Sequence, residues 1–193
     1  MATLRKKTKI VLTGAPSSGK STTLQALQKH FGDKVVLVPE SAVVLLSGGF
    51  PAPSHTDNEQ IRAFQKAILS VQENLEDIFS RKSSAPTMIL DRAKLDGAGF
   101  WPPGPEDYFK NFGVDYQHEL NSYDHVLFME LPKPEHFGGL AQTRFHNYEQ
   151  SLQSEKALEQ VWGKHKSFTK IQAEADLNKK IDHVIHVIEN LIK

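Results

Sequence analysis

Short apolar runs alternate with longer amphipathic stretches along the whole chain. Runs rich in Val, Ile and Leu predict buried strands at 9–13, 34–39, 87–91 and 124–131, and a weaker run predicts one at 168–172. Apolar residues at helical spacing predict helices over 20–31, 58–82, about 140–162 and 176–192. Since strands alternate with helices, we expect an α/β fold in which a five-stranded parallel sheet carries helices on both faces, in one domain over 1–193.

The segment directly after the first strand, GAPSSGKS, matches the P-loop pattern G-x-x-x-x-G-K-[ST]. Its glycines let the backbone curl around a phosphate, while Lys20 places a positive charge near the β- and γ-phosphates and Ser21 can ligate Mg²⁺. The strand before it and the helix after it are the context that such a loop requires. The predicted nucleotide-binding residues are Gly14, Ala15, Pro16, Ser17, Ser18, Gly19, Lys20, Ser21 and Thr22.

Two carboxylates follow predicted strands, at the edge of a parallel sheet where ligands bind. Asp91 ends the apolar run TMILD, the position from which a carboxylate holds Mg²⁺ near the γ-phosphate. The alternative for Asp91 is a strand-capping pair with Arg92. Glu40 follows the second strand, where it either takes the proton of an acceptor hydroxyl or starts the next helix.

Two glutamines, Gln65 and Gln72, fall in or beside the apolar stripe of the helix predicted at 58–82. A buried amide needs hydrogen-bond partners, so each side chain either bonds within the core or faces a pocket and binds a ligand. The Gly-, Pro- and aromatic-rich stretch from 92 to 116 contains Asp96 and Trp101. This stretch either walls a substrate pocket or covers the sheet, and its glycines and prolines disfavour a regular helix near its start.

Phosphoryl transfer also requires a cation near the charge that develops on the transferred group. In small kinases a mobile lid after the fourth strand supplies it. The candidates here are Lys133, in LPKPEHFGG, and Arg144, in QTRFHNYE. The alternative for Arg144 is an ordinary helix-surface arginine.

Composition narrows the class of protein further. Among the 193 residues, Lys plus Arg equals Asp plus Glu at 23 each, which argues against general nucleic-acid binding. The absence of cysteine fits a reducing compartment, and no apolar run approaches the ~20 residues of a membrane span. We therefore expect a cytoplasmic protein with a small-molecule partner, while the oligomeric state stays open.

Several segments together resemble a known family. GAPSSGKST, VPESA, LLSGGFP, FQKAI, ILDRAKLDGAGFWP and WGKHKSFTKI are similar to the AAA-type P-loop family that includes NadR-like nicotinamide riboside kinases and an animal nucleotide-binding trafficking protein. The resemblance implies a three-layer nucleotide-kinase-like fold that binds ATP or GTP with Mg²⁺. It also implies an acceptor site, with candidate residues Glu40, Gln65, Gln72, Arg92, Asp96 and Trp101.

The chain departs from the family pattern at two places. Ala93 stands where the family has Gly after Asp-Arg, and four residues separate Arg144 from Glu149, whereas the family's lid places a Glu soon after its Arg. ATP is the expected nucleotide, because the string NKKID at 178–182 has Ile181 where guanine-specific proteins place an Asp. The resemblance leaves GTP open.

Two functions follow from these residues. The first is an Mg²⁺-dependent kinase that phosphorylates a small hydroxyl-bearing, nucleoside-like acceptor, with Lys20, Glu40, Asp91 and Arg144 as candidate catalytic residues. The alternative is a nucleotide-dependent binding module or switch that hydrolyses its nucleotide slowly. An acceptor pocket favours the first function, and an exposed apolar or basic face that changes with the nucleotide favours the second.

Overall fold

One parallel sheet organises the protein. The structure, a computed structural model, describes residues 6–137 and 147–192. Its five strands lie in the order β2-β3-β1-β4-β5. They are β1 (Thr8–Thr13), β2 (Val35–Val38), β3 (Thr87–Asp91), β4 (His125–Met129) and β5 (Phe168–Ile171). The parallel sheet predicted from the sequence is confirmed, with strand ends that differ by at most two residues.

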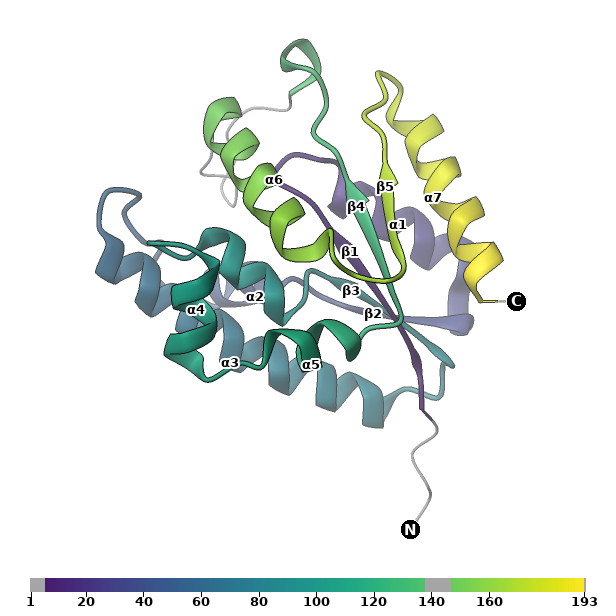
Figure 1. Cartoon of the computed structure of the whole chain (residues 1–193). Helices are drawn as coiled ribbons and strands as arrows, with labels where there is room; N and C mark the ends of the chain where they lie inside the picture. Colours follow the sequence, from purple (N-terminus) through teal and green to yellow (C-terminus); the bar gives the residue numbers. More distant parts are fainter. Residues whose placement is uncertain (1–5, 138–146, 193) are drawn as a thin grey trace.

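Helices cover both faces of the sheet (Figure 1). One face carries α1 (Lys20–Phe31) and α7 (Leu177–Leu191). The other face carries α3 (Asn58–Lys82), α4 (Pro105–Phe112), α5 (Tyr116–Asn121) and α6 (Tyr148–Trp162). The short α2 (Ser41–Ser47) follows β2, and 3₁₀ turns lie at η1 (Gly32–Lys34), η2 (Lys94–Phe100) and η3 (Pro134–His136). None of the helices described is long and apolar enough to cross a membrane.

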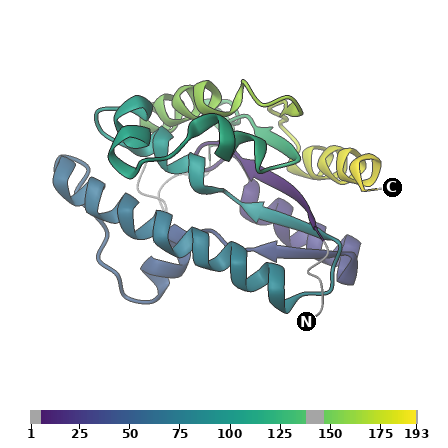
Figure 2. The same ribbon diagram turned by 60° about the horizontal axis from the view of Figure 1, so that its bottom comes forward.

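The central strand β1 divides the core in two, because alternate side chains of a strand point to opposite faces. Ile10 and Leu12 pack into the cluster that contains α1 and α7, whereas Val11 packs into the cluster under α3 to α6. Helix α3, with 25 residues, runs along the outside of the cluster that contains Val11 (Figure 2). Ile10, Val11 and Leu12 are fully buried. The phosphate-binding segment therefore starts from a strand that is packed on both faces.

The order of the strands places a crevice at the carboxyl edge of the sheet. The connection from β1 leads outward to β2, while the connection from β3 crosses β1 to reach β4. Neighbouring strands whose connections leave in opposite directions form a switch point, which is where α/β sheets bind ligands. The register pairs Leu12 with Asp91 and Thr13 with Phe128, so the loop after β1 starts beside the end of β3.

Two segments differ from the sequence prediction. The aromatic stretch forms η2, α4 and α5; Pro105 starts α4 because proline suits the first turn of a helix, and Asp115 caps α5. Helix α6 starts at Tyr148 and not near 140, because Asn147 and Gln150 form a reciprocal capping box at its N-terminus. The short helices α4 and α5 were not predicted, because neither is long enough to show a periodic apolar pattern. Packing among their aromatic side chains stabilises them instead.

Candidate active site

The P-loop backbone lies close to strand β4. Gly14 has a φ of 137°, and a Cβ atom there would lie 2.3 Å from the carbonyl oxygen of Met129. Gly19 has a φ of 95° and directly precedes α1, whose N-terminus has no side-chain cap. The first N–H groups of α1 are therefore available to an anion. Both glycines are required by backbone conformation and by close packing.

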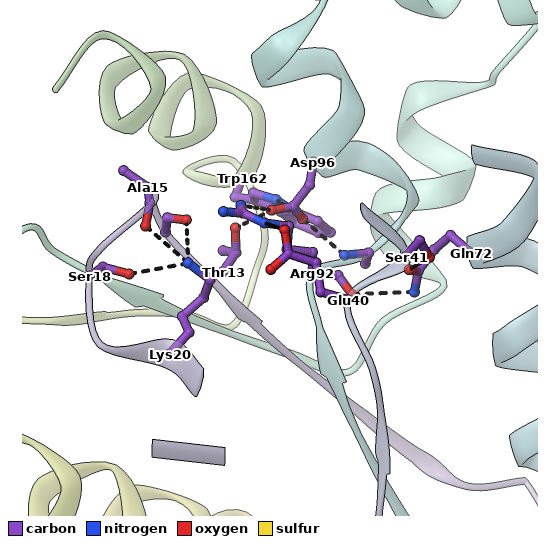
Figure 3. Close-up of polar contacts among 12 residues, drawn as sticks. Thr13, Ala15, Ser18, Lys20, Glu40, Ser41, Gln72, Arg92, Asp96 and Trp162 are labelled. Carbon is purple, nitrogen blue, oxygen red and sulfur yellow. Dashed lines mark hydrogen bonds and ion pairs between the residues drawn. The ribbon is translucent and has the colours of Figure 1, made fainter. Parts of the chain in front are cut away.

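Lys20 is buried inside the curl of the loop. Its Nζ atom donates to the carbonyl oxygens of Gly14 and Ala15, at 2.9 and 3.0 Å, and to Ser18 Oγ at 3.3 Å (Figure 3). Burial and the nearby Arg92 guanidinium lower the pKa of Lys20 to about 8. A phosphate beside this ammonium would favour the charged form, as an opposite charge does.

Asp91 lies at the end of β3 and is 7% exposed. Its Oδ1 atom has no hydrogen-bond partner among the described residues. Burial, with the Glu40 carboxylate as a second cause, raises the pKa of Asp91 to about 7, against the opposing charges of Lys20 and Arg92. A buried carboxylate oxygen without a donor fits a hard cation, and Ser21, exposed and bordering the same cavity as Lys20, is the second candidate ligand.

Arg92 connects two carboxylates at the end of β3. Its Nε atom donates to Glu40 Oε1 at 2.9 Å and its Nη1 atom donates to Asp96 Oδ1 at 3.1 Å. Its guanidinium also lies 5.0 Å from the centre of the Phe100 ring. Burial acts to lower the pKa of Arg92, but the carboxylates of Glu40, Asp96 and Asp91 raise it above its ordinary value. Arg92 therefore stays charged, and it holds Glu40 at the crevice.

Asp96 is 2% exposed, and both of its oxygens are used inside the protein. Besides Arg92, Thr13 Oγ1 donates to Oδ1 at 2.6 Å, while the Ala93 backbone N–H and Trp162 Nε1 donate to Oδ2 at 3.0 and 3.1 Å (Figure 3). These bonds join β1, η2 and α6 at one carboxylate. A direct contact of Asp96 with substrate stays a prediction, while the hydrogen bonds give it a positioning role.

A cavity of about 610 Å³ opens beside the P-loop. This volume suits a small-molecule ligand. Glu40, Gln65 and Gln72 all border it. From the P-loop, the cavity is bordered by Pro16, Ser17, Gly19, Lys20 and Ser21.

The two glutamines differ in how their amides are satisfied. Gln72 accepts from Ser41 Oγ at 2.6 Å and donates to Glu76 Oε1 and to the Arg92 carbonyl oxygen, at 3.2 and 3.3 Å. Gln65 is 7% exposed, and its Oε1 atom has no partner among the described residues. Gln72 thus bonds within the protein, whereas Gln65 leaves a buried acceptor for a ligand N–H or O–H.

The aromatic stretch both walls the cavity and covers the sheet. Phe100 and Trp101 border the cavity, whereas Tyr108 is 1% exposed and belongs to the core. Trp101 is held by its Nε1 bond to Asp107, at 2.7 Å, and Arg62 lies 4.8 Å over its ring. Part of this stretch therefore walls the cavity, and another part covers the sheet.

Two further candidates do not border the cavity, and a third lies outside the described residues. Lys133 is exposed and is not among the residues that border it. Thr22 is an exposed residue of α1 that also does not border it. Arg144 lies outside the described residues, so its role as a lid cation stays a prediction.

Three residues near the site were not identified from the sequence: Thr13, Ser41 and Lys180. Thr13 and Ser41 act through long-range bonds to Asp96 and Gln72 that no local pattern reveals. Lys180 had a readable signal, because it lies three residues after Leu177 and four before Val184, on the apolar stripe of α7. A lysine on such a stripe requires a buried partner.

Comparisons with known proteins identify the family and the fold. The profile of a family described as AAA domain matches residues 9–179. A comparison with curated proteins found no significant match. Among solved structures, deoxyadenosine kinase from M. mycoides with bound dATP is similar, with a TM-score of 0.65, 17% identity, and coverage of 94% of this chain and 99% of that chain. The fold is therefore that of a P-loop nucleotide kinase.

Replacement of Asp96 by Asn should destabilise the protein strongly. The amide would present a donor to groups that donate, and it would leave Arg92 with one carboxylate fewer. Breaking a buried pair of this kind costs about 3–5 kcal/mol, which urea unfolding would measure. Asp182→Asn, an exposed change on α7, is the control and should stay within about 0.5 kcal/mol. Equal stabilities of the two variants would contradict the positioning role.

Proposed function

The chain belongs to the AAA domain family, and from this premise we propose that it is an Mg²⁺-dependent kinase that transfers the γ-phosphoryl group of ATP to a small, nucleoside-like alcohol. One observation carries the proposal: the P-loop residues Lys20 and Ser21 border the same cavity as Glu40 and Gln65. A cavity bordered both by a phosphate-binding loop and by the polar groups of Glu40 and Gln65 suits a reaction between a bound phosphate and an acceptor hydroxyl.

The charges of the cavity support an acceptor without a phosphate group. Among the described residues that border it, the lysine and arginine side chains are those of Lys20 and Arg92. Lys20 belongs to the P-loop, and Arg92 is already bonded to Glu40 and Asp96. An acceptor phosphate would need additional cations, whereas a neutral alcohol does not. Apolar residues such as Phe64, which also borders the cavity, suit a ring.

The proposed reaction uses groups whose positions the fold fixes. Glu40 orients the acceptor hydroxyl and takes its proton as the new O–P bond forms. The bond between the γ-phosphorus and the bridging oxygen breaks, and ADP leaves. Lys20 stabilises the charge on the phosphates, and Arg92 holds the Glu40 carboxylate in place. Mg²⁺, held by Asp91 and Ser21, would neutralise phosphate charge.

One observation favours the switch as a second candidate function. Val43, Val44 and Phe50 are 38%, 40% and 38% exposed around α2, and Val43 also borders the cavity. Apolar side chains beside a nucleotide site can bind a protein partner in one nucleotide state. Turnover with an acceptor distinguishes this function from a kinase.

Replacement of Lys20 by Ala should weaken Mg·ATP binding and abolish turnover, because it removes the cation from the phosphates. We expect a loss of turnover of about 100-fold or more, measured by coupled nucleotide consumption, and a lower affinity by calorimetry. Lys29→Ala, an exposed change on the same helix, is the control. Unchanged affinity of the Lys20 variant for Mg·ATP would exclude the assigned nucleotide site.

Replacement of Glu40 by Gln should lower turnover far more than it lowers ATP affinity, because Glu40 is assigned to the acceptor. The loss expected for a general base is about 10²–10⁴-fold. A screen of nucleosides and vitamin-like alcohols by coupled nucleotide consumption identifies the acceptor for this measurement. Glu59→Gln is the control, since the Glu59 side chain is 85% exposed.

The outcomes separate the two functions. A kinase shows acceptor-dependent turnover that Glu40→Gln reduces. Slow hydrolysis with every acceptor, unchanged by Glu40→Gln, would instead support the switch.

A further inference from the structure

A second buried lysine reaches the P-loop from outside it. Lys180 lies in the first turn of α7 and is 2% exposed. Its Nζ atom donates to the carbonyl oxygen of Ser18 at 3.0 Å and to that of Glu130 at 2.6 Å. Ser18 belongs to the P-loop, and Glu130 directly follows β4. The ammonium group of Lys180 therefore joins the phosphate-binding loop to the carboxyl end of strand β4.

The surrounding contacts fix α7 in this place. Glu130 also accepts from the backbone N–H of Ala173 at 3.1 Å and pairs with Lys170 at 3.3 Å, which holds the chain between β5 and α7. Leu177 Cδ1 would lie 2.9 Å from a Cβ atom built on Gly19. The first turn of α7 thus packs directly against the loop, and Lys180 has little freedom to move away from it.

The bond to Ser18 acts on the next peptide N–H. In a trans peptide the C=O and the following N–H point in opposite directions. The Ser18 carbonyl points toward Lys180 on α7, so the N–H of Gly19 points in the opposite direction within the same peptide plane, away from α7. Hydrogen bonds to charged donors are about twice as strong as neutral ones, so Lys180 fixes this orientation firmly.

Lys180 is charged near neutral pH. Burial lowers its pKa to about 8, against the carboxylates of Glu130, Glu155 and Glu174, which raise it. The ammonium has three donors, and its bonds to Ser18 and Glu130 use two of them. Lys20, on the inner side, and Lys180, on the outer side, thus place two positive charges about the Ser18 segment.

We propose that Lys180 is a positioning residue for the nucleotide phosphates: by holding the Ser18 carbonyl from outside the loop, it keeps the Gly19 N–H directed at the phosphate and so sets the affinity for the triphosphate. The proposal rests on the nucleotide-binding part of the proposed function and is independent of the acceptor. It does not require Lys180 to touch the nucleotide.

The test compares Lys180→Met with the wild type in binding Mg·ATP and Mg·tripolyphosphate, measured by calorimetry at neutral pH. Methionine keeps an unbranched side chain, one heavy atom shorter than that of lysine, and removes both the donors and the charge. We expect both affinities to fall by about 10-fold or more, because both ligands use the P-loop. Lys179→Met, an exposed change at the neighbouring position, should leave them unchanged. Lys180→Arg, which can still donate to both carbonyls, should restore most of the affinity.

The outcomes are distinct. A lower unfolding midpoint with unchanged affinity of the folded Lys180→Met protein would show a merely structural lysine and overturn the proposal. Loss of ATP binding with unchanged tripolyphosphate binding would also overturn it. Should Lys180→Met not fold, Lys180→Gln, whose shorter side chain removes the charge and withdraws the donor from the Ser18 carbonyl, is compared in the same way, and the same fall in both affinities is expected. Absence of Mg·ATP binding by the wild type would overturn this proposal and the proposed function together, whereas failure of the acceptor screen alone would leave it standing.

Discussion

The buried ion pair between Arg92 and Asp96 is the interaction on which the site depends. A carboxylate removed from water is unfavourable unless charged and hydrogen-bonded partners compensate for it. Asp96 finds those partners on β1, η2 and α6, through Thr13, the Ala93 N–H and Trp162. The need to satisfy one carboxylate therefore brings three elements to the end of β3. The same guanidinium then holds Glu40, so the position of Glu40 at the cavity also depends on this pair.

Arg92 itself has an unusual backbone conformation that this pair maintains. Its φ is 68°, in the left-handed region that is unfavourable for a residue with a Cβ atom. Its backbone N–H nevertheless donates to Leu12 of the neighbouring strand, at 3.1 Å. The turn at Arg92 thus redirects the chain immediately after Asp91. The side chains of Asp91 and Arg92 therefore point to different parts of the crevice. Strain of this kind, of order 1–3 kcal/mol, persists where surrounding bonds determine the conformation.

Much of the fold could be predicted from the sequence, because its signals are local. Apolar runs identified the strands, and the glycines and Lys20 identified the phosphate-binding loop. The sequence could not predict that Gln72 bonds within the protein while Gln65 Oε1 has no partner among the described residues. Both glutamines lie near one helical stripe, and they differ only in distant partners such as Ser41. The position of Lys180 beside the P-loop was likewise hidden, because the contact joins residues 162 positions apart.

The distance along the chain between Ser18 and Lys180 has a consequence for synthesis on the ribosome. At about 5–20 residues per second, the helix that supports the P-loop is made roughly 8–32 s after the loop itself, because 162 positions separate Ser18 from Lys180. Strand β4, whose Met129 carbonyl packs against Gly14, also comes late in this order. A nascent chain thus contains the phosphate-binding sequence long before it has the scaffold that shapes it. The P-loop therefore gains its contacts with Met129 and Lys180 only after α7 has been made, and a ligand that stabilises the shaped loop can assist folding only from that stage on.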